Sequence, residues 1–227
     1  MKKTFVLAMT GASGAVYAVR LLEMMLAAGC DVHLSISPSA QLVLKQELDL
    51  SVDLQDFSAT SLMLNPADPN DSRIGLMRSM AGISSEESNV LAVNVGQPGE
   101  IHYHHYQNLM APIASGSFLT HGMVVCPCSQ STLGAIVHAT GENLIHRAAD
   151  VHLKERRRLV LVPRETPLSL PQLDNMKRAA EAGAVVLPAM PGFYHGVKSI
   201  RDLVDFVVAR ICDQLEISNS LIHRWGT

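Results

Sequence analysis

Aromatic and charged residues are scarce in this chain of 227 residues. Phe, Trp and Tyr make up 4% of it and Asp, Glu, Lys and Arg together 17%, against 48% hydrophobic residues. A small, well-solvated monomer does not need so much apolar surface, and we expect part of it to be buried between the subunits of a homo-oligomer. The net charge of -3 argues against a nucleic-acid-binding surface or a polybasic membrane anchor, and favours a small-molecule partner.

Cysteines and long apolar runs are scarce too. The four cysteines are too few, and too apolar in their surroundings, for a disulfide framework, which indicates a reducing, cytoplasmic location. No apolar run reaches the roughly 18 residues that would span a bilayer. The run Phe5–Met9, which follows two lysines, is shorter than the roughly 7 to 15 residues of a signal-peptide core. We interpret it as a first buried strand.

Apolar, β-branched runs recur along the chain and are typical of strands covered on both faces. Segments with helical spacing of apolar residues lie between them. This alternation predicts a flavodoxin-like or Rossmann-like α/β fold, a doubly wound parallel sheet in a three-layer sandwich, built by a single domain over residues 1–227. The expected strands are Thr4–Met9, Val32–Ser37, Met123–Cys126, Leu159–Val162 and Val185–Leu187. The expected helices are Val16–Ala28, Ala40–Gln46, Thr132–Ala139, Asn143–Arg157, Leu173–Ala182 and Ser199–Leu215.

The stretch 51–106 interrupts this alternation. Clusters of turn-forming residues at 65–71 and 96–99 separate it into short pieces. We interpret 51–106 as an insertion or flap within the domain, with a helix near Ile74–Met80 and a strand near Val90–Val95.

Polar residues follow the expected strands, at the edge where ligands of such folds bind. Gly11-Ala12-Ser13-Gly14 follows the first strand and opens a helix, where free backbone N–H groups and the helix dipole favour an anion. The loop lacks the glycines of a dinucleotide fingerprint and the Gly-Lys-Ser/Thr of a Walker A loop. It therefore predicts a phosphate-bearing ligand other than NAD, with a tight turn that binds nothing as the alternative.

A second polar strand end reads Cys126-Pro127-Cys128-Ser129-Gln130-Ser131-Thr132, whose hydroxyls can cap a helix or bind phosphate. The two cysteines lack the spacing and partners of a structural zinc site, and we interpret them as small buried hydrophobes. His102, His104 and His105 have no accompanying carboxylate or cysteine motif. We interpret these histidines as part of a solvated loop and assign no metal.

Basic residues gather on one helix and at one strand end. Arg147 and Lys154 are two helical turns apart on one face, so both can reach a common anion, although a solvated basic face is the simpler interpretation. Arg164 stands beside Glu165, where a cation and a carboxylate can hold phosphate and tune a proton-transfer group. A structural ion pair is the alternative for Arg164 and Glu165.

Taken together, several short motifs resemble the UbiX-like flavin prenyltransferases, a family formerly labelled 3-polyprenyl-4-hydroxybenzoate carboxy-lyases. They are Ala-Met-Thr-Gly-Ala-Ser-Gly at 8–14, Ala-Ser-Gly-Ser at 114–117, Cys-Pro-Cys-Ser at 126–129, Leu-Val-Leu-Val-Pro-Arg-Glu at 159–165, Pro-Gly-Phe-Tyr-His at 191–195, Asp-Leu-Val-Asp-Phe-Val-Val-Ala-Arg at 202–210 and Arg-Trp-Gly at 224–226. The resemblance covers most of the chain outside 51–106.

The resemblance implies a metal-independent transferase that joins the dimethylallyl group of dimethylallyl phosphate to N5 and C6 of reduced FMN. The product, prenylated FMN, would serve a separate decarboxylase of ubiquinone biosynthesis or aromatic-acid metabolism. The family's frequent dodecamer implies a homo-oligomer. An FMN-dependent cysteine-type decarboxylase of the same fold and a non-catalytic flavin carrier are the alternatives, but the catalytic histidine and the asparagine motif of the former are not evident.

The resemblance also implies roles for individual residues. Ser13 and Glu47 would lie near the reacting flavin, and Glu165 would transfer a proton. The residues implied to hold FMN are Gly11, Ala12, Ser13, Ser37, Ser129, Thr132, Arg147 and Arg164. Those implied to surround the substrate phosphate are Lys154, Arg164, Glu165, Tyr194 and Arg210. Leu109 stands where family members often carry an aromatic residue before Met-Ala-Pro, which predicts a weaker π contact to the isoprenyl group.

Overall fold

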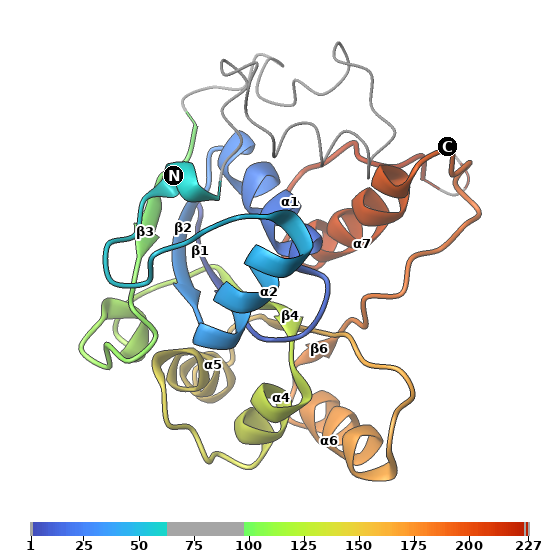
Figure 1. Ribbon diagram of the computed structural model, residues 1–227. Coiled ribbons are helices and arrows are strands. Elements are labelled where there is room, and N and C mark those ends of the chain that lie inside the picture. Colours follow the sequence, from blue (N-terminus) through green and yellow to red (C-terminus); the bar gives the residue numbers. More distant parts are fainter. Residues whose placement is uncertain (1, 63–97, 225, 227) are drawn as a thin grey trace.

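The computed structural model of the protein describes residues 2–62, 98–224 and 226 (Figure 1). These residues form a six-stranded sheet in the order β3-β2-β1-β4-β5-β6. Every neighbouring pair of strands is parallel. The strands are β1 Thr4–Met9, β2 Asp31–Ile36, β3 Ile101–Tyr103, β4 Gly122–Cys128, β5 Leu159–Pro163 and β6 Val185–Val186.

Helices cover both faces of the sheet (Figure 1). Side chains of α1, α2 and α7 pack on one face, and side chains of α4, α5 and α6 pack on the other. The helices of the described part are α1 Ala15–Ala27, α2 Pro38–Leu48, α4 Gln130–Val137, α5 Leu144–Lys154, α6 Leu170–Glu181 and α7 Ile200–Gln214, with short 3-10 turns η1 Ala59–Ser61 and η3 Pro112–Ala114. The predicted doubly wound α/β fold is confirmed.

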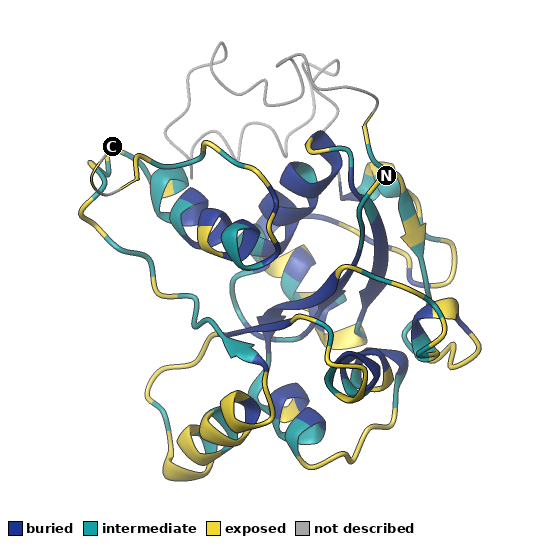
Figure 2. Ribbon diagram, turned by 180° about the vertical axis from the view of Figure 1, so that it is seen from behind, coloured by how far each residue is buried: buried dark blue, intermediate teal, exposed yellow. Residues whose placement is uncertain are grey.

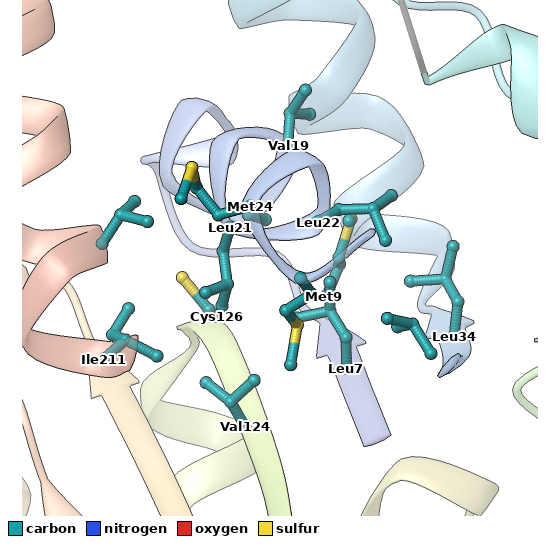
Figure 3. Close-up of a cluster of buried hydrophobic side chains, with 14 of the residues drawn as sticks. Leu7, Met9, Val19, Leu21, Leu22, Met24, Leu34, Val124, Cys126 and Ile211 are labelled. Atoms are coloured by element: carbon teal, nitrogen blue, oxygen red, sulfur yellow. The ribbon is translucent and has the colours of Figure 1, made fainter. Parts of the chain in front are cut away.

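The central strands are buried on both sides, which explains their continuous apolar sequence. In β1, Phe5, Leu7 and Met9 face α1, α2 and α7, while Val6 and Ala8 face the other helix layer. Figure 3 shows the first of these layers, where side chains of β1, β4, α1 and α7 meet. The sheet is the most buried part of the molecule (Figure 2). All five predicted strands and all six predicted helices are present, with small shifts at their ends.

The described ends of the stretch 51–106 belong to this fold. Val52 and Leu62 are buried in the core, and Ile101–Tyr103 forms the edge strand β3. The prediction of a solvated loop for the histidines was therefore wrong: His102 lies in β3, and Nε2 of His104 lies 2.8 Å from Nδ1 of the buried His33. Alternation had no chance to reveal a strand of three residues. The expected helix near 74–80 and strand near 90–95 lie outside the described residues, and the insertion stays a prediction.

A buried ion pair joins α7 to α1. The Arg20 guanidinium donates to both carboxylate oxygens of Asp205, with Nε 2.7 Å from Oδ1, and the two residues are 8% and 6% exposed. Arg201 reaches the same carboxylate at 3.3 Å. Because each charge neutralises the other away from water, the pair fixes how α7 lies against α1. Among the helices that are described, none is both long and apolar enough to cross a membrane.

Candidate active site

The ends of β1 and β4 are tied together at the carboxyl edge of the sheet. Thr10 is 2% exposed, and its N–H and Oγ1–H donate to the Pro127 carbonyl at 3.2 and 2.7 Å. The Ser129 N–H in turn donates to Thr10 Oγ1 at 2.8 Å. The chain leaves β1 towards β2 on one side and meets β4 on the other, so this edge is the crevice where doubly wound folds bind their ligands.

The loop after β1 passes close to the start of α2. A Cβ on Gly11 would overlap the Cβ of Ser39, so only glycine lets the loop take this path. Ser37 caps α2 by accepting from the Ala40 N–H at 3.1 Å, and its own N–H donates to the Met9 carbonyl at 3.0 Å. Gly11 and Ser37 are thereby held next to each other, with the backbone of the loop free of side-chain cover at Gly11.

Glu47, from the last turn of α2, lies at the start of α1. Its Oε2 accepts from the N–H groups of Gly14 and Ala15, both at 2.9 Å. The helix start therefore attracts an anion as predicted, and part of that negative charge comes from the protein itself. Because Gly14 follows Ser13 directly, the two residues expected near the flavin are neighbours in space.

Tyr17, one turn into α1, is a site residue that the sequence analysis missed. Its ring lies against Gly14, where a Cβ would be 2.9 Å from Cδ2 of the tyrosine. Burial raises the pKa of Tyr17; the charge of Cys126 also raises it, Arg164 lowers it and Glu47 raises it. The phenol thus lies within electrostatic reach of Glu47 and Arg164, which belong to different layers of the site. An aromatic residue one turn after a loop glycine was the available signal.

The hydroxyls after β4 form a cap for α4. Ser129 Oγ accepts from the Thr132 N–H at 3.3 Å and donates to Thr132 Oγ1 at 3.0 Å. The cysteines in β4 are buried, as predicted, with both Cys126 and Cys128 0% exposed. Burial raises the pKa of Cys128 to about 12, so this thiol stays protonated at neutral pH.

Arg164 and Glu165 follow β5 and are exposed at the same carboxyl edge. Ala189 N–H donates to the Pro163 carbonyl at 3.0 Å, so the segment that leads to Tyr194 also starts there. The structure thus gathers most of the residues implied to act on the ligands at one edge. They are Gly11, Ala12, Ser13, Ser37, Glu47, Ser129, Thr132, Arg164 and Glu165.

Tyr194 and Arg210 approach each other on α7. The ring of Tyr194 meets the ring of Phe206 edge-on, with centroids 5.6 Å apart, and Arg210 lies one turn further along the helix. Arg210 is held by Asp213 at 3.0 Å. A groove of about 280 Å³ between β6 and α7 is lined by residues that include Val185, Met190, Phe206 and Arg210.

Arg147 and Lys154 bind different partners on α5. Arg147 donates to the Ala114 carbonyl at 3.0 Å and pairs with Asp150 at 2.7 Å. Lys154 pairs with Glu155 at 2.8 Å. Arg157, which the sequence analysis did not single out, donates to the carbonyls of Phe118 and Gly116. The basic residues of α5 therefore hold the Ala-Ser-Gly-Ser segment against the helix.

Lys154 and Arg164 lie at opposite edges of the sheet. Lys154 ends α5 on the amino side of β5, and Arg164 follows the carboxyl end of that strand. The extended strand Leu159–Pro163 spans about 16 Å, at roughly 3.3 Å per residue. One chain therefore does not bring both cations to one phosphate.

Residues 1–212 match the model of a family described as Flavoprotein. A flavin prenyltransferase UbiX of Pseudomonas aeruginosa is 45% identical over 220 residues, which cover 97% of this chain and 92% of that protein. The phosphopantothenoylcysteine-type (PPC) decarboxylase, by contrast, shares the fold alone, with 13% identity, a TM-score of 0.54 and 84% of each chain covered.

Two solved structures are similar over the whole chain. A UbiX protein in complex with FMN and dimethylallyl pyrophosphate has a TM-score of 0.76 at 35% identity and covers 100% of this chain and 99% of its own. A dodecameric FMN-dependent UbiX-like decarboxylase from Escherichia coli O157:H7 has a TM-score of 0.75 at 33% identity and covers 99% and 100%. By sequence and by fold, the chain belongs to the Flavoprotein family and, within it, to the UbiX-type flavin prenyltransferases.

Proposed function

We propose that this protein joins the dimethylallyl group of dimethylallyl phosphate to N5 and C6 of reduced FMN. The observation that carries the proposal is the carboxyl edge, where the Gly11 loop, Glu47, the Ser129 cap and Arg164 come together. Support also comes from the similarity to flavin prenyltransferases over nearly the whole chain.

The residues at this edge fit FMN. The uncovered backbone at Gly11 allows a large planar ligand to approach, and Ala12, Ser13 and Ser37 add N–H and hydroxyl groups. Ser129 and Thr132 contribute further hydroxyls, and Arg164 a guanidinium. Reduced FMN, when bound, supplies the two nucleophilic positions, N5 and C6.

The chain's own residues would manage the charge of the reaction. As the C–O bond of the substrate breaks, the phosphate takes the electron pair, and cations must offset the growing negative charge. Arg164, Lys154 and Arg210 supply cations, and Tyr194 a hydroxyl. Glu165 would move the proton that ring closure releases, while Ser13 and Glu47, at the start of α1, would orient N–H groups of the flavin.

Lys154 would reach the phosphate from a second subunit, because its own chain keeps it at the far edge of the sheet. Large exposed apolar side chains support an assembly that covers them, among them Met110 at 93%, Leu170 at 79% and Leu119 at 77%. The similarity to a dodecameric UbiX-like protein supports a homo-oligomer of that kind. Arg147 would then stand near the FMN of a neighbouring subunit.

We place the reaction in the cytoplasm, with a separate decarboxylase of ubiquinone or aromatic-acid metabolism as the acceptor of prenylated FMN. Free thiols at Cys30, Cys126, Cys128 and Cys212 suit a reducing compartment.

Mass spectrometry tests the activity directly. The protein is incubated anaerobically with reduced FMN and dimethylallyl monophosphate, and the flavin is then weighed. A gain of one five-carbon unit is the expected result. FMN that is bound but unmodified would overturn the proposal in favour of the decarboxylase or the flavin carrier.

A further inference from the structure

His195 connects the segment before α7 to the helix itself. Its Nε2–H donates to the carbonyl of Asp202 at 3.1 Å. Its ring stacks on Phe206, with centroids 5.2 Å apart and an angle of 22° between the planes. A single side chain thus binds the first turn of α7 through a hydrogen bond and the second turn through an aromatic face.

The neighbouring Tyr194 depends on the same contacts. Its ring also meets Phe206, at an angle of 88°, yet the residue is 60% exposed, so burial alone does not hold it in place. Gly192 brings the segment close to both rings, because a Cβ there would lie 2.9 Å from Phe206 Cζ and from Tyr194 Cε1. The position of Tyr194 is therefore set by how the segment is fastened to α7.

The second ring nitrogen of His195 shows that this fastening has a cost. With the proton on Nε2, Nδ1 carries a lone pair, and this buried atom has no hydrogen-bond partner within the described residues. An unpaired buried acceptor is unfavourable, so the bond to Asp202 and the stacking on Phe206 must outweigh it. A plain apolar side chain would fill the space without that penalty but would lose the bond to Asp202.

We propose that His195 is a positioning residue, which holds Tyr194 beside Arg210 for binding of the isoprenyl phosphate. Phe206 and Arg210 are one turn apart on α7, so fixing Tyr194 on Phe206 also fixes its place relative to the guanidinium. His195 acts through Tyr194 and is not itself catalytic. The inference rests on the proposed function and adds a residue to which neither the motifs nor the proposed site assigned a role.

Steady-state kinetics of His195→Ala provide the first test. The KM for dimethylallyl monophosphate should rise about tenfold, the size expected for one lost hydrogen bond with its packing, while kcat and the Kd for FMN change little. His195→Gln keeps an N–H donor and should recover part of the loss, and His195→Phe keeps the stacked ring. His138→Asn is the matched control, since this exposed histidine makes its Nε2 contact with Asn175 on α6.

A double-mutant cycle separates positioning from general damage. If His195 acts through Tyr194, then His195→Ala in a Tyr194→Ala background should raise the KM by less than about twofold. Full additivity, an unchanged KM in the single variants, or a Kd for FMN that rises in step with the KM would overturn the inference. The Gln and Phe variants keep the test open if the alanine variant misfolds. Failure of the wild-type protein to form any prenyl adduct would instead refute the proposed function.

Discussion

The carboxyl edge of the sheet and the outer face of α5 hold their polar groups in different ways. At the edge, short side chains and backbone groups bind one another, as Thr10, Pro127 and Ser129 do. On α5, long cationic side chains lean on neighbouring acids, as in the exposed pair Lys154–Glu155. The first arrangement is rigid and complete within one chain. The second leaves a cation that can exchange its carboxylate partner for a phosphate at small cost, since exposed ion pairs contribute little to stability.

The largest effect should come from separating the two regions in different chains. Lys154→Ala and Arg164→Ala should each slow adduct formation about a thousandfold, because each removes a cation from the developing charge of the leaving phosphate. If the two cations come from different subunits, oligomers reassembled from equal amounts of both variants should regain about a quarter of the wild-type sites.

Single-turnover rates of each variant, of the mixture and of Lys177→Ala measure this effect. Lys177 is the control because it pairs with Glu181 on the exposed side of α6. No recovery in a mixture that is shown to exchange subunits would mean that both cations act within one chain.

Glu165→Gln tests the edge itself and should have the next largest effect. The substitution keeps shape and hydrogen bonding but removes the proton acceptor, so adduct formation should slow about a hundredfold while FMN stays bound. Rapid mixing of the FMN-loaded enzyme with dimethylallyl monophosphate gives the rate, and fluorescence of FMN gives its Kd. A rate equal to that of the wild type would remove Glu165 from the mechanism.

Gly11→Ala tests whether the edge is rigid. The added Cβ would overlap the Cβ of Ser39, and overpacking of this kind costs about 2 kcal/mol, so FMN should bind about thirtyfold more weakly. Calorimetric titration with FMN measures the change. The double variant Gly11→Ala/Ser39→Gly removes the overlap and should restore most of the affinity. A single variant that binds FMN as the wild type does would show that the loop yields freely.

The smallest effect concerns stability on the exposed side. Arg210→Ala breaks the pair with Asp213, yet Arg224 also binds that carboxylate at 2.8 Å. The free energy of unfolding should therefore fall by less than about 1 kcal/mol. Arg20→Met, which leaves the buried Asp205 carboxylate without its main partner, should cost about 3 to 5 kcal/mol and serves as the contrast in the same urea titration. Equal losses would contradict the distinction between a buried clamp and an exchangeable surface cation.

Local sequence signals were sufficient for the secondary structure and the fold class. Continuous apolar runs specify strands buried on both faces, and serines such as Ser37 and Ser129 mark helix starts within a few residues of the helices they cap. The edge strand β3 escaped because it is three residues long and carries His102. Its pairing with β2 depends on residues far away in the chain, and no local pattern reports that.

The chain itself also determined which residues stand at the strand ends, because a parallel sheet brings all carboxyl ends to one edge. Only the tertiary structure decided their partners. Glu47 binds the start of α1 across 33 residues, because α2 folds back over α1. Tyr17 joins the site through the same packing. Lys154 and Arg164, though close in sequence, lie at opposite edges because an extended strand runs between them, and spacing alone carries no information about that direction.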